Sequence, residues 1–131
     1  MRLSAVLFAL IVLPSSAIAQ AQAPAGDIAI LQTLDKVTGR VRGLEAPVGQ
    51  AVEFGPLTIL VRACRKRPPE EPPESSAFLE ISERKSADTV NELFKGWMFA
   101  SSPAVSALEH PVYDVWVIDC RAARTSAPAS R

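Results

Sequence analysis

The side chains best suited to chemistry gather between positions 101 and 114. Ser101 and Ser102 precede His110, the only histidine of the chain, and Asp114 follows it. Serine, histidine and aspartate are the residue types of a hydrolase in which the histidine accepts the serine proton. No Gly-x-Ser-x-Gly motif surrounds either serine, however. Ser102 stands before a proline, as a helix cap does, and His110 stands before a proline, as turn residues do. A structural role is therefore favoured over catalysis.

The same stretch holds the only local set of metal-ligating side chains. It consists of Glu109, His110 and Asp114. Zinc and other transition metals are usually held by several histidine or thiolate ligands, and one histidine is too few for such a set. We therefore expect neither a metal nor a cofactor.

The first residues of the chain form an export signal. Met1 and Arg2 give a short positive start, residues 3–13 are almost wholly apolar, and small residues follow. This pattern is typical of a secretory signal peptide at residues 1–19, with cleavage after Ala19 or, in an overlapping alternative, after Ala21. The apolar run is shorter than the ~20 residues that a membrane-spanning helix needs. We expect a periplasmic protein whose mature chain has no transmembrane segment.

The two cysteines fit that compartment. Cys64 and Cys120 each end an apolar run, and an oxidising periplasm favours a disulfide between them. A redox-active pair would more typically be close in sequence, as in Cys-x-x-Cys. We therefore predict one structural disulfide, and we expect the strands that it joins to lie side by side.

The charge of the chain argues against nucleic acid as a partner. There are 14 basic and 14 acidic residues, and loss of Arg2 with the signal leaves one acidic residue in excess. Binding to phosphate backbones requires a net basic face. An envelope protein or another periplasmic protein is the expected partner, and the oligomeric state is left open.

Short apolar runs separated by glycines and prolines predict an all-β domain. We expect a small antiparallel sandwich or barrel of about seven strands, with one short helical turn and one disulfide. A flexible lead should precede this single domain and a disordered tail should follow it. The predicted boundaries are 20–26 for the lead, 27–120 for the domain, 121–131 for the tail and 104–109 for the helical turn, with strands at 28–34, 41–45, 52–54, 57–64, 77–84, 92–100 and 112–120.

Strict alternation assigns the side chains of these strands to faces. In the fourth strand it places Cys64 on the face of Leu60, and in the last strand it places Cys120 on the face of Trp116. The sixth strand is apolar on both faces, which predicts a position inside the sandwich.

Two groups of residues could form a binding surface. A basic cluster stands before the acidic, proline-rich part of an exposed connector at 65–76. We interpret it as a solvated loop in which opposite charges balance, and an anion-binding patch is the alternative. The aromatic residues are interpreted as core, although a subset exposed beside a groove would instead bind a partner. The two groups are Arg62, Arg65, Lys66 and Arg67, and Phe94, Trp97, Phe99, Tyr113 and Trp116, of which Trp97, Tyr113 and Trp116 are the candidates for binding.

Four stretches carry a family likeness. They are LDKVTGR at 34–40, FGPLTILVRAC at 54–64, AFLEI at 77–81 and GWMFASSPAVSALEHPVYDVWVIDC at 96–120. Through them the chain resembles the exported bacterial proteins of the domain of unknown function 2155 family, from about Leu34 to Cys120. The resemblance implies an exported single-domain protein without an assigned activity.

These observations favour a non-catalytic periplasmic binding or envelope-structural module over an enzyme. A small periplasmic hydrolase that uses Ser101 or Ser102 with His110 and Asp114 is the alternative, and an inhibitor or small-ligand carrier is a third. A cleft that brings His110 to a serine hydroxyl would favour the hydrolase, whereas an exposed apolar surface would favour binding.

Overall fold

A computed structural model describes residues 27–123, in which the chain forms seven β-strands and one 3₁₀ turn. The predicted signal peptide, the flexible lead and most of the predicted tail lie outside these residues. The elements follow one another as β1 (Ile28–Asp35), β2 (Arg40–Pro47), β3 (Ala51–Phe54), β4 (Leu57–Lys66), β5 (Ser75–Arg84), β6 (Val90–Phe99), η1 (Pro103–Val105) and β7 (Tyr113–Arg121).

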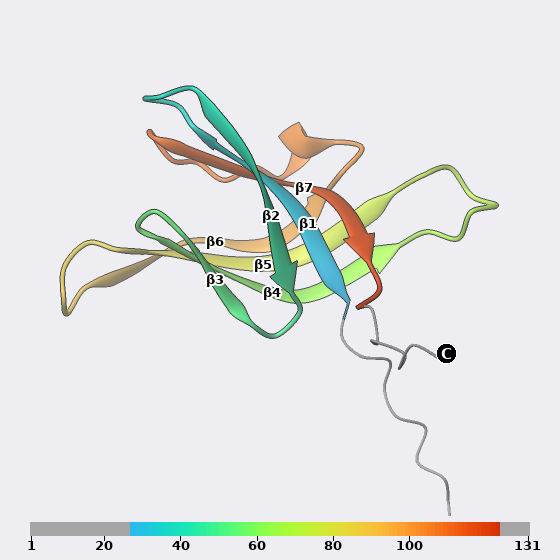
Figure 1. Ribbon diagram of the computed structural model, residues 1–131, viewed down its shortest axis with the longest axis horizontal. Coiled ribbons are helices and arrows are strands. Elements are labelled where there is room, and N and C mark those ends of the chain that lie inside the picture. The colour runs from blue at the N-terminus through green and yellow to red at the C-terminus, as the bar shows by residue number, and fades with distance from the viewer. Residues whose placement is uncertain (1–26, 124–131) are drawn as a thin grey trace, which may run out of the picture.

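The strands form two antiparallel sheets (Figure 1). One sheet has three strands in the order β2-β1-β7, and the other has four in the order β3-β4-β5-β6. In Figure 1 the strands β1, β2 and β7 run diagonally across the other sheet. The all-β prediction is confirmed, and the architecture is the sandwich rather than the barrel.

Glycines shape two of the hairpin turns. Gly39 has a φ of 69° and Gly55 a φ of 55°, in the left-handed region that glycine adopts without steric penalty. The N–H of Gly39 donates to the carbonyl oxygen of Asp35 at 2.7 Å and closes the β1–β2 turn. Gly55 also lies against Tyr113, since an added Cβ would meet the phenolic oxygen at 3.2 Å. The glycines that mark these turns in the sequence are therefore required by the backbone conformation of the turns.

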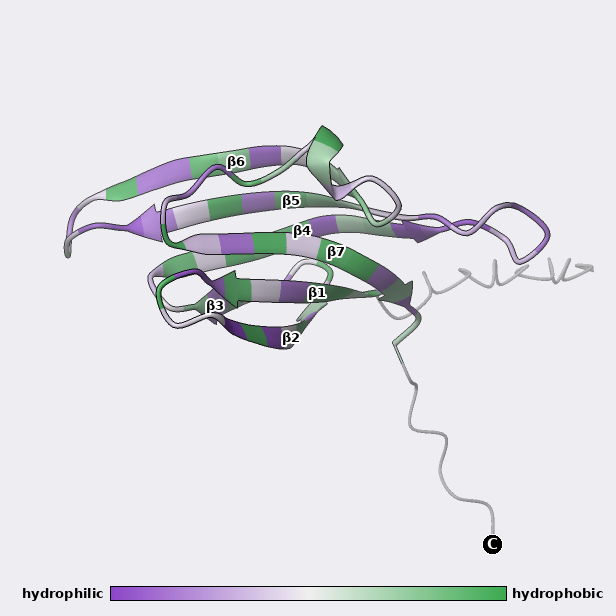
Figure 2. Cartoon of the chain, turned by 90° about the horizontal axis from the view of Figure 1, so that it is seen from above, coloured by the Kyte–Doolittle hydropathy of each residue, from purple (hydrophilic) through white to green (hydrophobic). Residues whose placement is uncertain are grey.

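The core between the sheets is aliphatic. Hydrophobic and polar residues alternate along the strands (Figure 2), and one face of each sheet points inward. No aromatic side chain is fully buried within residues 27–123. The prediction that the large aromatics belong to the core holds in part, because Phe94 and Tyr113 pack against it. It is wrong for Trp97 and Phe99, which are not among the residues of the core or those packed against it. The inward positions hold Ala29, Leu31, Ala46, Leu57, Ile59, Val61, Ala77, Leu79, Ile81, Met98, Val115 and Val117.

A β-bulge in each of two strands changes the predicted faces of the cysteines. The register of β4 against β5 shifts between Val61 and Ala63, and that of β7 against β1 shifts next to Ile118. An extra residue reverses the alternation that follows it. Cys64 and Cys120 therefore point into the core, with exposed fractions of 5% and 6%, and not outward as strict alternation predicted.

The predicted disulfide is present between these two inward cysteines. Their Cα atoms are 5.7 Å apart, a separation that a disulfide spans readily. The expectation that the bridged strands lie side by side is wrong, because β4 and β7 belong to different sheets. The bond therefore joins the two layers of the sandwich.

β6 is an edge strand and not the internal strand that its apolar pattern predicted. Phe94 and Met98 face the core, opposite Ile81 and Ala77 of β5. Trp97 has the opposite orientation. Both faces of β6 are apolar because the outer face of this sheet carries aromatic side chains.

The helical turn is shorter than predicted. It covers only Pro103–Val105, and the hydroxyl of Ser102 makes no capping hydrogen bond. The turn is closed by the main chain, since the N–H of Val105 donates to the carbonyl oxygen of Ser102 at 3.1 Å. The chain is extended at Ser106, and Leu108 then reaches the core with 5% of its surface exposed. An isolated short helix has little stability of its own. The burial of Leu108 therefore determines the course of the chain after η1.

The proline-rich connector is also shorter than predicted. β4 continues to Lys66 and β5 begins at Ser75, and these two residues are paired. Only residues 67–74 form the loop, which we call the arm. The arm extends the β4–β5 hairpin beyond the body of the sandwich (Figure 1).

Replacing both cysteines by serine should lower the free energy of unfolding by about 4 kcal/mol, because the bond closes a long loop in the unfolded chain. Chemical denaturation of the oxidised wild type and of the Cys64→Ser/Cys120→Ser variant measures the difference. Reduction should destabilise the wild type and leave the variant unchanged. Equal denaturation midpoints for the two proteins would contradict the structural role of the bond.

Candidate functional site

The two candidate serines are engaged differently. The hydroxyl of Ser101 donates to a carboxylate oxygen of Glu74, and its N–H donates to the other oxygen at 3.0 Å. Ser102 contributes its backbone carbonyl to the 3₁₀ turn. No hydrogen bond between residues 27 and 123 joins either serine to His110.

His110 is a turn residue whose side chain is largely buried. Its side chain is 7% exposed, and its Nδ1 accepts the N–H groups of Val112 and Tyr113, each at 3.0 Å. Because Nδ1 accepts, Nε2 carries the proton and donates to Glu83 at 3.2 Å. A catalytic histidine of the serine type instead receives the serine proton at Nε2 and donates from Nδ1. Both ring nitrogens are therefore used to hold the turn.

Asp114 has a third set of contacts. Its carboxylate is 3.0 Å from the ammonium of Lys36, which also donates to the carbonyl oxygen of His110 at 2.8 Å. Lys36 thus ties the β1–β2 turn to the start of β7. The three residue types of the hydrolase alternative lie near one another in sequence but take part in separate interactions.

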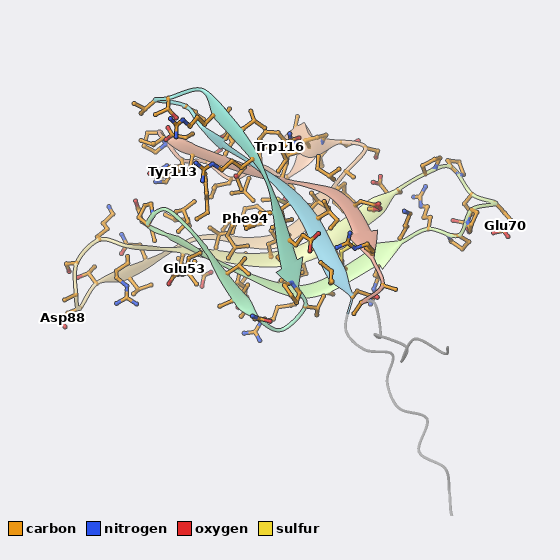
Figure 3. All side chains as sticks on the ribbon, in the orientation of Figure 1. Glu53, Glu70, Asp88, Phe94, Tyr113 and Trp116 are labelled. Carbon is orange, nitrogen blue, oxygen red and sulfur yellow. A yellow bond between two sulfur atoms is a disulfide. The ribbon has the colours of Figure 1, made fainter. Side chains whose placement is uncertain are left out.

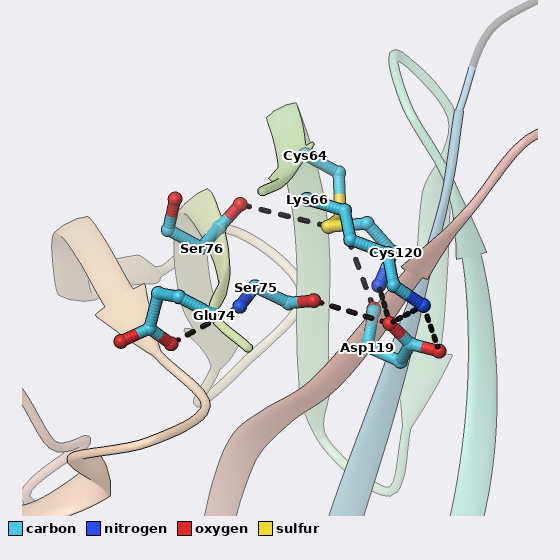
Figure 4. Close-up of polar contacts among 7 residues, drawn as sticks. All are labelled: Cys64, Lys66, Glu74, Ser75, Ser76, Asp119 and Cys120. Atoms are coloured by element: carbon cyan, nitrogen blue, oxygen red, sulfur yellow. Dashed lines mark hydrogen bonds and ion pairs between the residues drawn. A yellow bond between two sulfur atoms is a disulfide. The ribbon is translucent and has the colours of Figure 1, made fainter. Parts of the chain in front are cut away.

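A polar network surrounds the disulfide at the base of the arm (Figure 4). Asp119 is 2.9 Å from the ammonium of Lys66, accepts the hydroxyl of Ser75 at 3.1 Å and accepts the N–H of Cys120 at 2.8 Å. The hydrogen bond from Lys66 is the main cause that lowers the pKa of Asp119 below its ordinary value. The ionised carboxylate therefore stabilises the fold above about pH 4, and this contribution is lost as the pH falls through the lowered pKa.

Glu74 fixes the other side of the arm. It accepts the N–H of Ser75 as well as both donors of Ser101. The hydroxyl of Ser101 is the main cause that lowers the pKa of Glu74, and its N–H is the second. The base of the arm is therefore attached to β7 through Asp119 and to the segment after β6 through Glu74.

The outer face of the four-stranded sheet carries a group of aromatic side chains. Phe78 of β5 is paired with Trp97 of β6, and Ser76 with Phe99. The rings of Phe78 and Trp97 meet edge to face, with centroids 5.6 Å apart, and the guanidinium of Arg65 lies 5.5 Å from the centroid of Trp97. All three aromatic side chains are only half-buried. We call Phe78, Trp97, Phe99 and Arg65 the aromatic face.

An ionic group adjoins the aromatic face. Glu80 is 3.1 Å from Arg62 and 3.6 Å from Lys95, so two cations share one carboxylate. The hydrogen bond from Arg62 is the main cause that lowers the pKa of Glu80. Arg65 has no carboxylate within ion-pair distance among the described residues. Within this group of charges, the three cations Arg62, Arg65 and Lys95 therefore outnumber the one carboxylate, Glu80.

The structure separates the other predicted binding residues from this face. Lys66 is paired with Asp119, and Arg67 lies 4.0 Å from Glu71 within the arm. Tyr113 packs against Phe54 and His110 at the far end of the molecule. Trp116 is on the other sheet, where it lines an open hollow of about 380 Å³ beside η1.

Sequence reasoning missed Phe78, Glu80 and Lys95. Each lies on the outer face of its strand: Phe78 is paired with Trp97, which was singled out, and Glu80 is paired with Leu60 and Lys95. The pairing register of β4, β5 and β6 would have identified them, but alternation within one strand does not give that register.

Two general features complete the description of the site. Residues 27–123 contain no cluster of three or more histidine, cysteine, aspartate or glutamate side chains arranged to hold a metal ion. None of the helical segments in that range is long and apolar enough to span a membrane.

Comparison with known proteins identifies the family. The family model described as "Uncharacterized protein conserved in bacteria (DUF2155)" matches residues 29–120. The chain belongs to this family. An uncharacterized protein of Rickettsia prowazekii (strain Madrid E) is 30% identical over 87 residues, which cover 66% of this chain and 56% of that protein. The chain thus spans just over half the length of this relative. No solved structure matches the chain.

Membership of the DUF2155 family confirms the resemblance found in the sequence. The matched residues run from Ala29 in β1 to Cys120, the second cysteine of the disulfide. Both the base of the arm and the aromatic face therefore lie within the part of the chain that defines the family.

His110→Ala should lower the free energy of unfolding by about 2–3 kcal/mol, because two partly buried N–H groups and Glu83 lose their partner. His110→Asn should recover part of this loss, since its side-chain oxygen can accept in place of Nδ1. Denaturant unfolding measures both variants, and Ser102→Ala is the neutral control. An alanine variant as stable as the wild type would contradict the structural role of His110.

Proposed function

We propose that the protein is a non-catalytic binding module of the periplasm, in which the aromatic face holds an extended segment of an envelope protein. The observation that supports this most is the placement of Phe78, Trp97 and Phe99 on the side of the four-stranded sheet turned away from the core. Large aromatic side chains at binding surfaces contribute much of the affinity.

The charges beside the face indicate the chemistry of the partner. Arg65 contacts the ring of Trp97, and Arg62 and Lys95 share one carboxylate. A segment that presents apolar or proline side chains to the rings and carboxylates to these cations would satisfy both features. The partner is therefore an acidic polypeptide segment in an extended conformation.

The proposed location follows from other parts of the chain. The export signal expected at residues 1–19 supports delivery across the inner membrane. The Cys64–Cys120 bond agrees with this location, since disulfides persist in an oxidising compartment.

The rigidity of the sheet supports a role in binding. The aromatic face is built on paired strands and not on loops, so its side chains are held in place before a partner arrives. Such preorganisation reduces the conformational entropy that is lost on association.

Reversing charge on the face should weaken partner binding at least tenfold without unfolding the protein. The variant is Arg65→Glu/Lys95→Glu, and Arg40→Glu on β2 of the other sheet is the matched control. Crosslinking in cells with quantitative mass spectrometry identifies proteins that the wild type and the control recover and the variant does not. Each such protein is then purified, and its dissociation constant is measured with all three forms.

Melting temperatures and cellular abundance should be alike for the three forms, because the substituted side chains are exposed. The proposal predicts a purified partner that binds the double variant more weakly than the wild type and binds the control as tightly as the wild type. Equal affinities for the double variant and the control would contradict it.

A further inference from the structure

The arm is a rigid projection and not a loose loop. Its ends are joined by the hydrogen bond from the N–H of Arg67 to the carbonyl oxygen of Glu74, at 3.0 Å, and a turn is closed from Glu71 to Pro68 at 3.1 Å. Residues 67–73 are exposed throughout. Figure 3 places Glu70 at the tip, away from the body of the molecule. Four prolines further restrict the backbone.

The arm has the chemistry that the aromatic face requires. Its sequence, RPPEEPPE at 67–74, presents prolines next to carboxylates. Glu70 has no ion-pair partner in the described part of the chain, and Glu71 lies 4.0 Å from Arg67. Prolines dock onto aromatic side chains with little loss of conformational freedom, and the glutamates carry the charge opposite to that of Arg62, Arg65 and Lys95.

An arm cannot occupy the face of its own molecule. The arm leaves β4 and β5 at the Lys66–Ser75 pair, next to Arg65 of the aromatic face and its partner Ser76. It continues away from the sandwich (Figures 1 and 3). Its tip therefore lies beyond the face that its own strands carry. A second molecule can bring its arm there.

We propose that the arm of one copy docks on the aromatic face of a second copy, so that the chain forms a reciprocal dimer. This inference rests on the proposed function, because it takes the aromatic face to be the binding surface and names one occupant. A two-fold axis would place each arm on the face of the other copy and close the assembly. The two contacts support one another, since forming the first makes the second intramolecular.

Sedimentation equilibrium of the full chain, purified after export, tests association over a range of concentrations. The wild type should form dimers, and its dissociation constant should rise with ionic strength. Glu70→Lys/Glu71→Lys and, separately, Arg65→Glu should each raise the dissociation constant at least tenfold. Asp88→Lys changes an exposed carboxylate at the tip of the β5–β6 hairpin instead (Figure 3) and should have no effect.

Mixing the two kinds of variant is the decisive part of the experiment. In the mixed dimer, the lysine arm meets the glutamate face, and the wild-type arm meets the wild-type face. Association should therefore return in the mixture although each variant alone is monomeric. A monomeric wild type at every concentration, or a mixture that stays monomeric, would overturn the inference.

The outcome also distinguishes this inference from the proposed function. A monomeric wild type that loses a purified envelope partner on Arg65→Glu/Lys95→Glu would overturn the dimer and leave the binding role standing. A dimer that responds to both sets of substitutions, with no envelope partner affected, would support the dimer and remove the envelope partner from the proposed function.

Discussion

The covalent bond between β4 and β7 is the constraint on which the rest of the structure depends. It joins the two sheets at the end from which the arm projects. Two bulges are needed to turn the cysteines toward one another, and both lie within a few residues of the bond. The same bulges place Asp119 where it meets Lys66 and Ser75. The bond, the bulges and the carboxylate therefore form one unit that sets the position of the arm.

The composition of the core leaves Phe78, Trp97 and Phe99 free for a surface. Alanine, valine, leucine, isoleucine and methionine fill most of the space between the sheets, and short aliphatic chains suit the separation of about 10 Å between packed sheets. Trp97 and Phe99 are then on the outer face and only half-buried. An aromatic outer face has no role in packing the two sheets together. This separation of core from outer face supports the proposed binding role.

Much of the fold was predictable because it depends on local signals. Alternation and turn residues gave all seven strands, and cysteine placement gave the disulfide. The faces of Cys64 and Cys120 were not predictable, because a bulge reverses alternation without a distinctive residue type. The edge position of β6 was missed because an apolar outer face looks the same in sequence as a second buried face. Ser102 was misread as a cap because burial of Leu108 overrides the local preference for a helix.

The candidate site was predictable only in part for a related reason. Arg62, Arg65 and Trp97 were singled out and lie on the same side of the four-stranded sheet, but Tyr113 and Trp116 were grouped with them through sequence proximity alone. The structure places those two elsewhere, against Phe54 and beside η1. Sheet register decides which aromatic residues share a face, and register depends on contacts between distant strands.

Photocrosslinking in living cells tests the central claim, that the outer face of the four-stranded sheet is the surface that binds. A photoreactive amino acid would replace Leu60 or Phe99 on that face, and Val41, which is 50% exposed on β2, would be the control position. The account predicts crosslinked protein adducts from positions 60 and 99 and none from position 41. Adducts confined to position 41, with none from the other two, would contradict it.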